Sequence, residues 1–172
     1  NTVAIGAPYN SDNGYHSGHV RVYENISGVW SQIGQDIDGE TGSNYSGFSV
    51  SISSDGNKVA IGARTNSGNG TYAGHVRVYE NIGGYWSQIG QDIDGELAYD
   101  NSGHSVSISS DGNIVAIGAP YNDGGGNQSG HVRIFEKIGG VWTQIGQDID
   151  GADQTNNCGW SVSLNGSGNI VA

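Results

Sequence analysis

Short stretches in which every second residue is apolar recur along the whole chain. In residues 47–53, for example, the sequence GFSVSIS alternates apolar residues with serine. Successive side chains of a strand point to opposite faces, so this period of two predicts a half-buried β-strand. The chain is therefore expected to be built from strands.

Four such strands make up one unit. They are predicted to span residues 47–53, 58–63, 75–80 and 85–91. The first two are joined by the sequence SDGN, whose Asp-Gly pair favours a tight hairpin. A polar, glycine-rich loop joins the second strand to the third, and the turn NIGG joins the third to the fourth. This order predicts an up-and-down antiparallel sheet.

The unit is repeated with a fixed period. The segment Val-Ala-Ile-Gly-Ala begins at Val3, Val59 and Val115, which are 56 residues apart. Residues 74–95 repeat residues 18–39 with only two substitutions. A period this regular is the signature of a repeat architecture.

Tandem, helix-free units of four short strands are typical of the blades of a β-propeller. We therefore expect an all-β fold, a β-propeller with four-stranded antiparallel blades of 56 residues, of which the chain holds three equivalents. The predicted boundaries are 1–46 for blade 1 (strands 2 to 4), 47–102 for blade 2, 103–158 for blade 3, and 159–172 for the first strand and the start of the second strand of a further blade. Three blades are too few to close a ring, so further blades of the same or a longer chain are expected partners.

Composition removes two classes of partner. The 172 residues include 17 acidic and 6 basic ones, which gives a formal net charge of −11. Phosphate binding needs basic patches, so nucleic acid is not expected as a partner. No apolar run approaches the roughly 20 residues of a membrane-spanning helix, so membrane insertion is not expected either.

Several segments, taken in order, resemble a known family of repeats. They are residues 47–52 (GFSVSI), the Asp-Gly turn at Asp55, residues 59–63 (VAIGA) and residues 74–79 (GHVRVY). Together they resemble the FG-GAP repeats of integrin α subunits, and more closely the integrin-like propeller repeats in surface proteins of marine bacteria and algae. The resemblance implies a secreted, extracellular or cell-surface propeller that binds a protein or glycan ligand in adhesion or recognition.

The calcium loop of that family has no counterpart in this chain. Calcium-binding FG-GAP blades carry a long DxDxDG-type loop between the first two strands, whereas residues 53–57 read only SSDGN. A two-residue hairpin offers too few oxygens for the about 6 to 8 ligands that calcium takes. The site of the family is therefore not expected.

A second acidic pattern leaves two interpretations open. Carboxylates recur after the fourth strand at Asp36, Asp38, Glu40, Asp92, Asp94 and Glu96. Three carboxylates in five residues would bind calcium if backbone carbonyls and a neighbouring blade helped. The alternative is an Asp-Gly turn whose carboxylates accept backbone N–H bonds or face water. Ala152 replaces the glutamate in the third copy without any other change, so the turn is favoured and no cofactor is expected.

A histidine, an arginine and a tryptophan recur in every copy. They are His19, His75, His131, Arg21, Arg77, Arg133, Trp30, Trp86 and Trp142. Alternate residues of a strand share a face, so the histidines and arginines are expected to line up beside the tryptophans, with arginine stacked on the rings. A residue that is identical in every blade serves the blade, so a structural role is expected. His16 and His104 do not recur and are expected at the surface.

The copies differ mainly in two connections, the one between the second and third strands and the one between successive units. Both emerge at the same end of an up-and-down sheet, so we expect one variable face that binds the ligand. The candidate residues are Tyr9, Tyr15, His16, Tyr72, Tyr99, Tyr121 and Trp160. The alternative is drift of unconstrained loops.

Known catalytic motifs are absent. The sequence contains no Gly-x-Ser-x-Gly elbow, no HExxH helix and no phosphate-binding turn before a helix. We therefore expect a non-catalytic module for cell-surface adhesion or structural assembly. The alternative is a carbohydrate-binding propeller lectin that holds sugar rings in pockets beside the interblade tryptophans.

Overall fold

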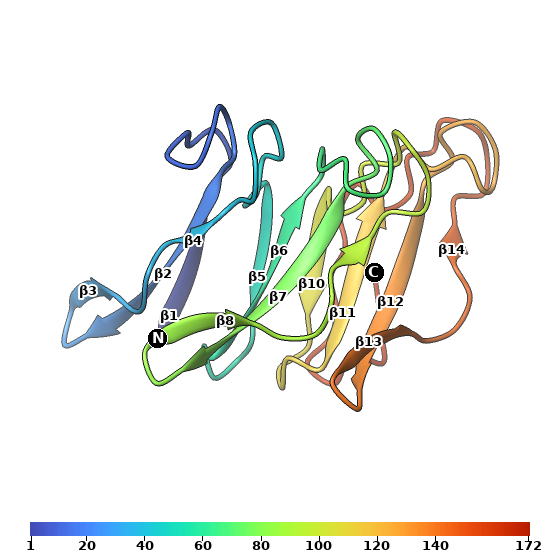
Figure 1. Cartoon of the computed structure of the whole chain (residues 1–172). Coiled ribbons are helices and arrows are strands. Elements are labelled where there is room, and N and C mark those ends of the chain that lie inside the picture. The colour runs from blue at the N-terminus through green and yellow to red at the C-terminus, as the bar shows by residue number, and fades with distance from the viewer.

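The computed structural model describes all 172 residues, arranged as three antiparallel sheets that stand side by side (Figure 1). The first sheet contains β1 (Thr2–Ala7), β2 (His19–Ile26), β3 (Val29–Gln32) and β4 (Ile37–Asp38). The second contains β5 (Ser49–Ile52), β6 (Lys58–Ala63), β7 (His75–Ile82), β8 (Tyr85–Gln88) and β9 (Ile93–Asp94). The third contains β10 (Ser105–Ile108), β11 (Ile114–Ala119), β12 (His131–Ile138), β13 (Val141–Gln144) and β14 (Ile149–Asp150). The all-β prediction is confirmed, and no helix is long and apolar enough to cross a membrane.

Sequence neighbours pair within each sheet, as the alternation predicts. The second sheet has the order β5-β6-β7-β8, with Ser49 opposite Gly62 and Tyr79 opposite Gln88. The first sheet starts at β1 and has no counterpart of β5. The sheets lie within residues 2–38, 49–94 and 105–150, while the limits of the blades stay a prediction.

The predicted fourth strand, residues 85–91, is wrong in its extent. It ends at Gln88 as β8, and the separate strand β9, beyond the predicted range, also pairs with β7. Gly90 lies in the break with a φ of +76°, and a Cβ there would lie 2.6 Å from the ring of Trp142 in the next sheet. The strand breaks because the backbone must make room for that ring, which the alternation of residues within one unit does not reveal.

Two apolar clusters fill the spaces between neighbouring sheets. The first joins Val20, Val22 and Ile37 to Val59, Ile61 and Trp86. The second joins the apolar residues of the second sheet to those of the third, including Trp142. Burial of such side chains stabilises a fold by about 1.5–3 kcal/mol for each, so the stack of sheets is the core of the molecule.

The two ends of the sheets differ in kind. At the turn end, short turns join β2 to β3 and β5 to β6. At the loop end, the long connections meet: the Ser43 amide donates to the Tyr15 carbonyl at 2.7 Å, and the Tyr99 amide donates to the Thr71 carbonyl at 2.8 Å. The variable connections therefore gather at one end, at the top of Figure 1.

Candidate functional site

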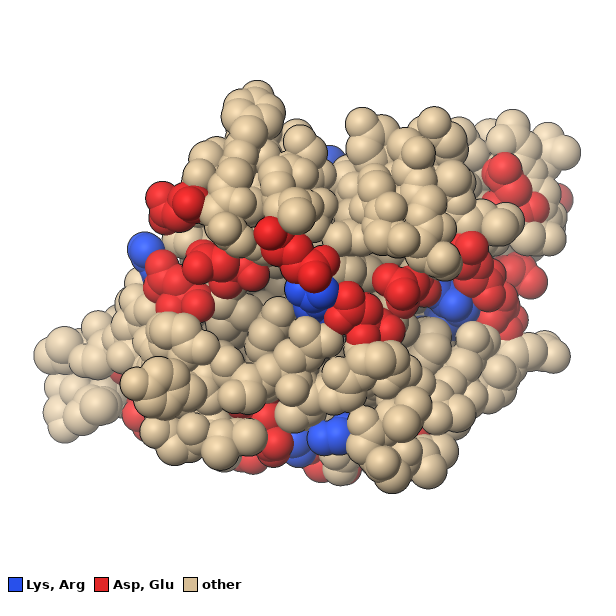
Figure 2. All heavy atoms as spheres, in the orientation of Figure 1, with Lys and Arg blue, Asp and Glu red and all other residues tan.

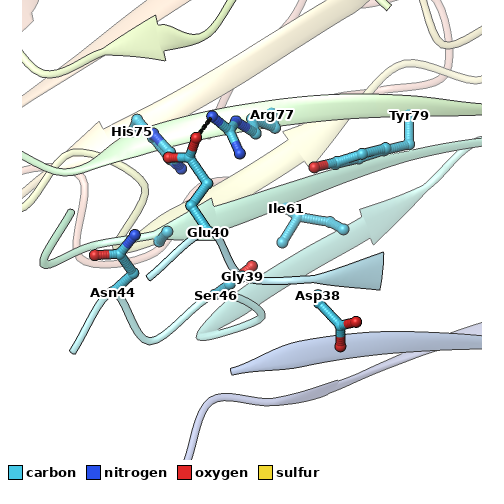
Figure 3. A pocket seen from close by; sticks show the side chains of 10 residues that line it. Asp38, Gly39, Glu40, Asn44, Ser46, Ile61, His75, Arg77 and Tyr79 are labelled. Carbon is cyan, nitrogen blue, oxygen red and sulfur yellow. Dashed lines mark ion pairs between the residues drawn. The ribbon is translucent and has the colours of Figure 1, made fainter. Parts of the chain in front are cut away.

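A histidine and an arginine share one face of the central strand in each sheet. In the second sheet, Arg77 Nε and Nη2 donate to Asp92 Oδ1 and Oδ2 at 2.8 and 2.6 Å. Asp92 can reach Arg77 because it lies in the break between β8 and β9. Glu40, from the connection that precedes β5, pairs with the same guanidinium, beside His75 (Figure 3). We call this arrangement the His–Arg–Asp network.

The network recurs with small changes in the other sheets. In the first sheet, Arg21 donates to both oxygens of Asp36 at 2.9 and 2.7 Å. In the third, Arg133 Nη2 instead donates to the Asp94 carbonyl at 2.7 Å, and Nη1 lies 3.4 Å from Glu96. Charged side chains therefore form a belt across the sheets, and fewer of them lie on the loop end above it (Figure 2).

Burial and ion pairing fix the protonation states in the network. Burial lowers the pKa of His75 to about 4, and the positive charge of Arg77 adds to this effect. The hydrogen bonds from Arg21 lower the pKa of Asp36 to about 2. Near pH 7 the imidazole of His75 is thus neutral and the carboxylate of Asp36 is ionised, so the network is a fixed set of ion pairs.

The predicted calcium-binding residues are divided between sheets. Ligand atoms of Asp36 and Asp38 lie within 4.8 Å of one another and of His19. Glu40 instead groups with His75 and Asp92, and Glu96 groups with His131 and Asp148. The three carboxylates of one segment therefore do not converge on one point. Each group contains a histidine and carboxylates that could hold a metal, but Arg77 already pairs with two of these carboxylates.

Two of the three repeated tryptophans, Trp86 and Trp142, are packed against the preceding sheet, whereas Trp30 in the first sheet is 52% exposed. Trp86 is 4% exposed, and its Nε1 donates to the Ile33 carbonyl at 2.9 Å. Trp142 is 3% exposed and makes the same bond to Ile89. No arginine lies over a repeated tryptophan, so that part of the predicted stacking is wrong. Of the other rings in the pattern, Phe135 has the Arg133 guanidinium 5.2 Å from its centre. The rings of Trp86 and Trp142 are enclosed, so neither leaves an open pocket for a sugar.

The residues predicted to bind a ligand fall into three aromatic groups at the loop end, one for each repeat. The first contains Tyr9, Tyr15 and His16, the second Tyr72 and Tyr99, and the third Tyr121 and Trp160. Tyr45, which the sequence analysis missed, joins the first group with its ring 5.5 Å from that of Tyr9. No single pocket unites the seven residues. A polar surface hollow of about 410 Å³, which includes Tyr72, lies between the first and second groups.

His104, Phe48 and Arg64 complete the third group and were missed as site residues. The expectation that His104 lies at the surface is wrong, since it is 9% exposed and packs between Phe48 and Trp160. The guanidinium of Arg64 lies 3.9 Å from the centre of the Phe48 ring. One signal was available: Phe48, His104 and Trp160 occupy the same position in successive copies, directly after an unchanged glycine.

One segment of the chain matches a known family of repeats. Residues 93–135 match the family model of the FG-GAP repeat. The prediction of FG-GAP-related repeats is therefore confirmed. This FG-GAP segment runs from β9 into β12 and crosses from the second sheet to the third. No curated protein sequence matches the chain.

The chain matches two solved structures. A putative 6-phosphogluconolactonase from Bacteroides uniformis has a TM-score of 0.59 and 12% identity, with 89% of this chain and 40% of its own chain covered. The periplasmic gluconolactonase of Pseudomonas aeruginosa has a TM-score of 0.47 and 17% identity, with 86% and 38% covered. The chain thus spans about two fifths of the length of either structure. The first likeness shows a propeller-like all-β fold around the FG-GAP segment.

The likeness also corrects the expectation that the chain is not an enzyme. A protein with a similar fold is described as a putative 6-phosphogluconolactonase, so missing motifs of other folds do not exclude catalysis on this one. At 12% identity the likeness concerns the fold alone. Function must be argued from the side chains of this chain.

Proposed function

We propose that the chain is part of a β-propeller at a cell surface, which recognises a protein or glycan ligand through the loop end. The observation that carries the proposal is the contrast between copies: the scaffold is nearly identical, while the three aromatic groups at the loop end differ. A rigid scaffold that presents variable loops is the usual arrangement of a binding module. The FG-GAP match and the resemblance to integrin-like surface repeats support a role in adhesion outside the cell.

Each sheet acts as one blade in this proposal, and further blades of the same kind complete the ring. The two junctions within the chain support this interpretation, because both use one device. Gln35 accepts from the Trp86 amide at 3.0 Å and donates to the Trp86 carbonyl at 2.8 Å. Gln91 and Trp142 repeat the pair of bonds one period later. A junction built twice from the same residues extends naturally to further blades.

Attachment of the chain, displayed at high density on beads, to cells and to glycan and matrix-protein arrays tests the proposal. A loop-end variant combines Tyr15→Ser with Tyr72→Ser, and its matched control at the turn end is Tyr85→Ser, a residue 69% exposed. We expect attachment to fall at least tenfold in the loop-end variant and to stay unchanged in the control. Equal attachment by the two variants, or no attachment by the wild type, would overturn the proposal.

A catalytic assay belongs to the same experiment, because one protein of similar fold is described as a lactonase. The bead-bound protein is incubated with a sugar lactone, and the release of acid is followed. If the wild type does not attach, and the loop-end variant still turns over the lactone, the function would be catalysis at another site and not recognition by the loop end.

A further inference from the structure

Three different rings occupy one backbone position at the loop end. Phe48, His104 and Trp160 each follow a glycine with positive φ, at 80°, 81° and 85°. Each of these glycines lies against the central strand of the sheet before it, so the three rings are presented at equal intervals. The strands that follow Phe48 and His104, β5 and β10, run side by side (Figure 1). The backbone therefore places the three rings in a row, and the three positions differ only in their side chains.

The rings of this row are in contact. The centre of the Phe48 ring lies 5.1 Å from that of His104, and the His104 ring lies 4.4 Å from that of Trp160. Tyr121 stands edge-on to Trp160 at 6.2 Å. Trp160 is 55% exposed, so the row opens to solvent at this step. With Arg64 above Phe48, these five residues form what we call the Arg64 platform.

Arg64 is unlike the other arginines of the molecule. Arg21, Arg77 and Arg133 each lie beside a carboxylate, at 2.7, 2.6 and 3.4 Å. Arg64 has no carboxylate partner, although the chain carries a net charge of −11. Its Nε is buried and makes no hydrogen bond, which it shares with Arg133 Nε, but Arg133 lies beside Glu96. A buried donor without a partner is rare in folded proteins, because its desolvation is not repaid by a hydrogen bond.

A second buried polar atom in the platform also lacks a partner. His104 Nδ1 makes no hydrogen bond, and the side chain is more than nine-tenths buried between aromatic rings. Two unpartnered polar groups beside one row of rings indicate a ligand that brings polar atoms and an apolar face. The negative face of an aromatic ring attracts the C–H groups of a sugar, and a guanidinium binds carboxylate or sulfate oxygens through charge-assisted hydrogen bonds.

We propose that the Arg64 platform binds an anionic carbohydrate, with a sugar ring on Trp160 and Tyr121 and the acidic group on Arg64 and His104. This inference rests on the proposed function and names its ligand. It also moves sugar binding from Trp86 and Trp142, which are enclosed, to Trp160, the tryptophan exposed at the loop end.

Calorimetry with the 172-residue chain tests the platform against three probes of equal length: a tetragalacturonate, its methyl ester, and a sulfated neutral tetrasaccharide. The ester keeps the rings and removes the charge. We expect it to bind at least tenfold more weakly than the acid, because the ester cannot form charge-assisted hydrogen bonds with Arg64. Binding of the sulfated probe would extend the ligand to sulfate esters, whereas its failure would restrict the ligand to carboxylates.

Two variants separate charge from stacking. Arg64→Gln is expected to abolish the preference for acid over ester, whereas Trp160→Ala weakens both probes alike and Tyr85→Ala weakens neither. Equal binding of acid and ester by the wild type, or an unchanged preference in Arg64→Gln, would overturn the platform. So would equal binding of a tetra-aspartate peptide, which carries acid without sugar rings. If the calorimetry overturns the platform in one of these ways but bead attachment is still lost in the Tyr15 and Tyr72 variant, the proposed function stands and only this ligand assignment fails.

Discussion

The belt of ion pairs and the loop end use the same kinds of residue in opposite ways. Arg77 is held by Asp92 and Glu40 within the belt, whereas Arg64 at the loop end has an aromatic ring beneath it and no carboxylate beside it. Histidine differs likewise, since His75 recurs in every repeat and His104 occurs once. The repeated arginines and histidines each lie beside a carboxylate, whereas the unrepeated Arg64 and His104 have none. The difference indicates that repetition serves cohesion and that variation serves recognition.

The largest expected effect separates two tryptophans of the same motif. Trp142→Ala removes a ring that fills the space between two sheets and should lower the free energy of unfolding by about 3–5 kcal/mol. Trp30→Ala is the matched control, because Trp30 is 52% exposed, and it should cost less than about 1 kcal/mol. Urea denaturation followed by circular dichroism measures both. Equal losses would mean that Trp30 is also enclosed, for instance by another copy of the chain.

The next effect is the dependence of stability on pH. The folded pKa of His75, about 4, lies below its ordinary value of 6.5. The unfolded chain therefore takes up a proton first, and stability that is full above pH 6.5 is lost as the pH falls to about 4. The loss should be about 3 kcal/mol for this residue. Asp36, with a pKa of about 2, adds its own loss only below about pH 4.

Denaturation at about pH 7, 5 and 4 measures this loss, and His75→Gln is the control. The variant should show a flatter profile between pH 6.5 and 4, since the glutamine does not titrate. A wild-type profile that is flat in this window would mean that His75 is protonated in the folded protein. The imidazolium would then pair with Asp92, whose carboxylate lies 3.7 Å away.

Arginine gives the third contrast. Arg77→Gln leaves Asp92 and Glu40 facing each other without a guanidinium and should cost about 2 kcal/mol in stability. Arg64→Gln should change stability by less than about 0.5 kcal/mol, because no carboxylate depends on that side chain. Thermal unfolding of the two variants at about pH 7 compares them. A large loss in Arg64→Gln would show that its contact with Phe48 stabilises the fold and would weaken its role as a ligand-binding group.

The sequence predicted the strands better than the contacts between them. The alternation in residues 47–53 and the period of 56 residues were sufficient for the sheets, because both are local properties of the chain. Gly90 escaped notice as a strand break, since its reason lies in Trp142, 52 positions further along. The pair of Glu40 with Arg77 likewise joins residues of different units. Contacts of this kind depend on how adjacent sheets are spaced, which no period within one unit encodes.

His104 illustrates the same limit at the candidate site. An unrepeated histidine is usually placed at the surface, yet the rings before and after it in the row enclose its imidazole. The sequence shows that three different aromatic residues occupy this position. It does not show that their rings touch, because the contacts form only when the three copies stack. Arg64 was missed for a related reason: a lone arginine becomes informative only once the partners of all the others are known.

The smallest expected effect concerns calcium. Removal of calcium with a chelator should change the melting temperature by less than about 1 °C, because the carboxylates of Asp92 and Glu40 already pair with Arg77 and offer little binding energy to a cation. Asp38 is the carboxylate that would contradict this result, since it lies with His19 and Asp36 and pairs with no arginine. A rise in melting temperature with added calcium that is absent in Asp38→Asn would identify the first sheet as a metal site. The belt would then bind a ligand of its own, and the division between a cohesive belt and a recognising loop end would hold only for the second and third sheets.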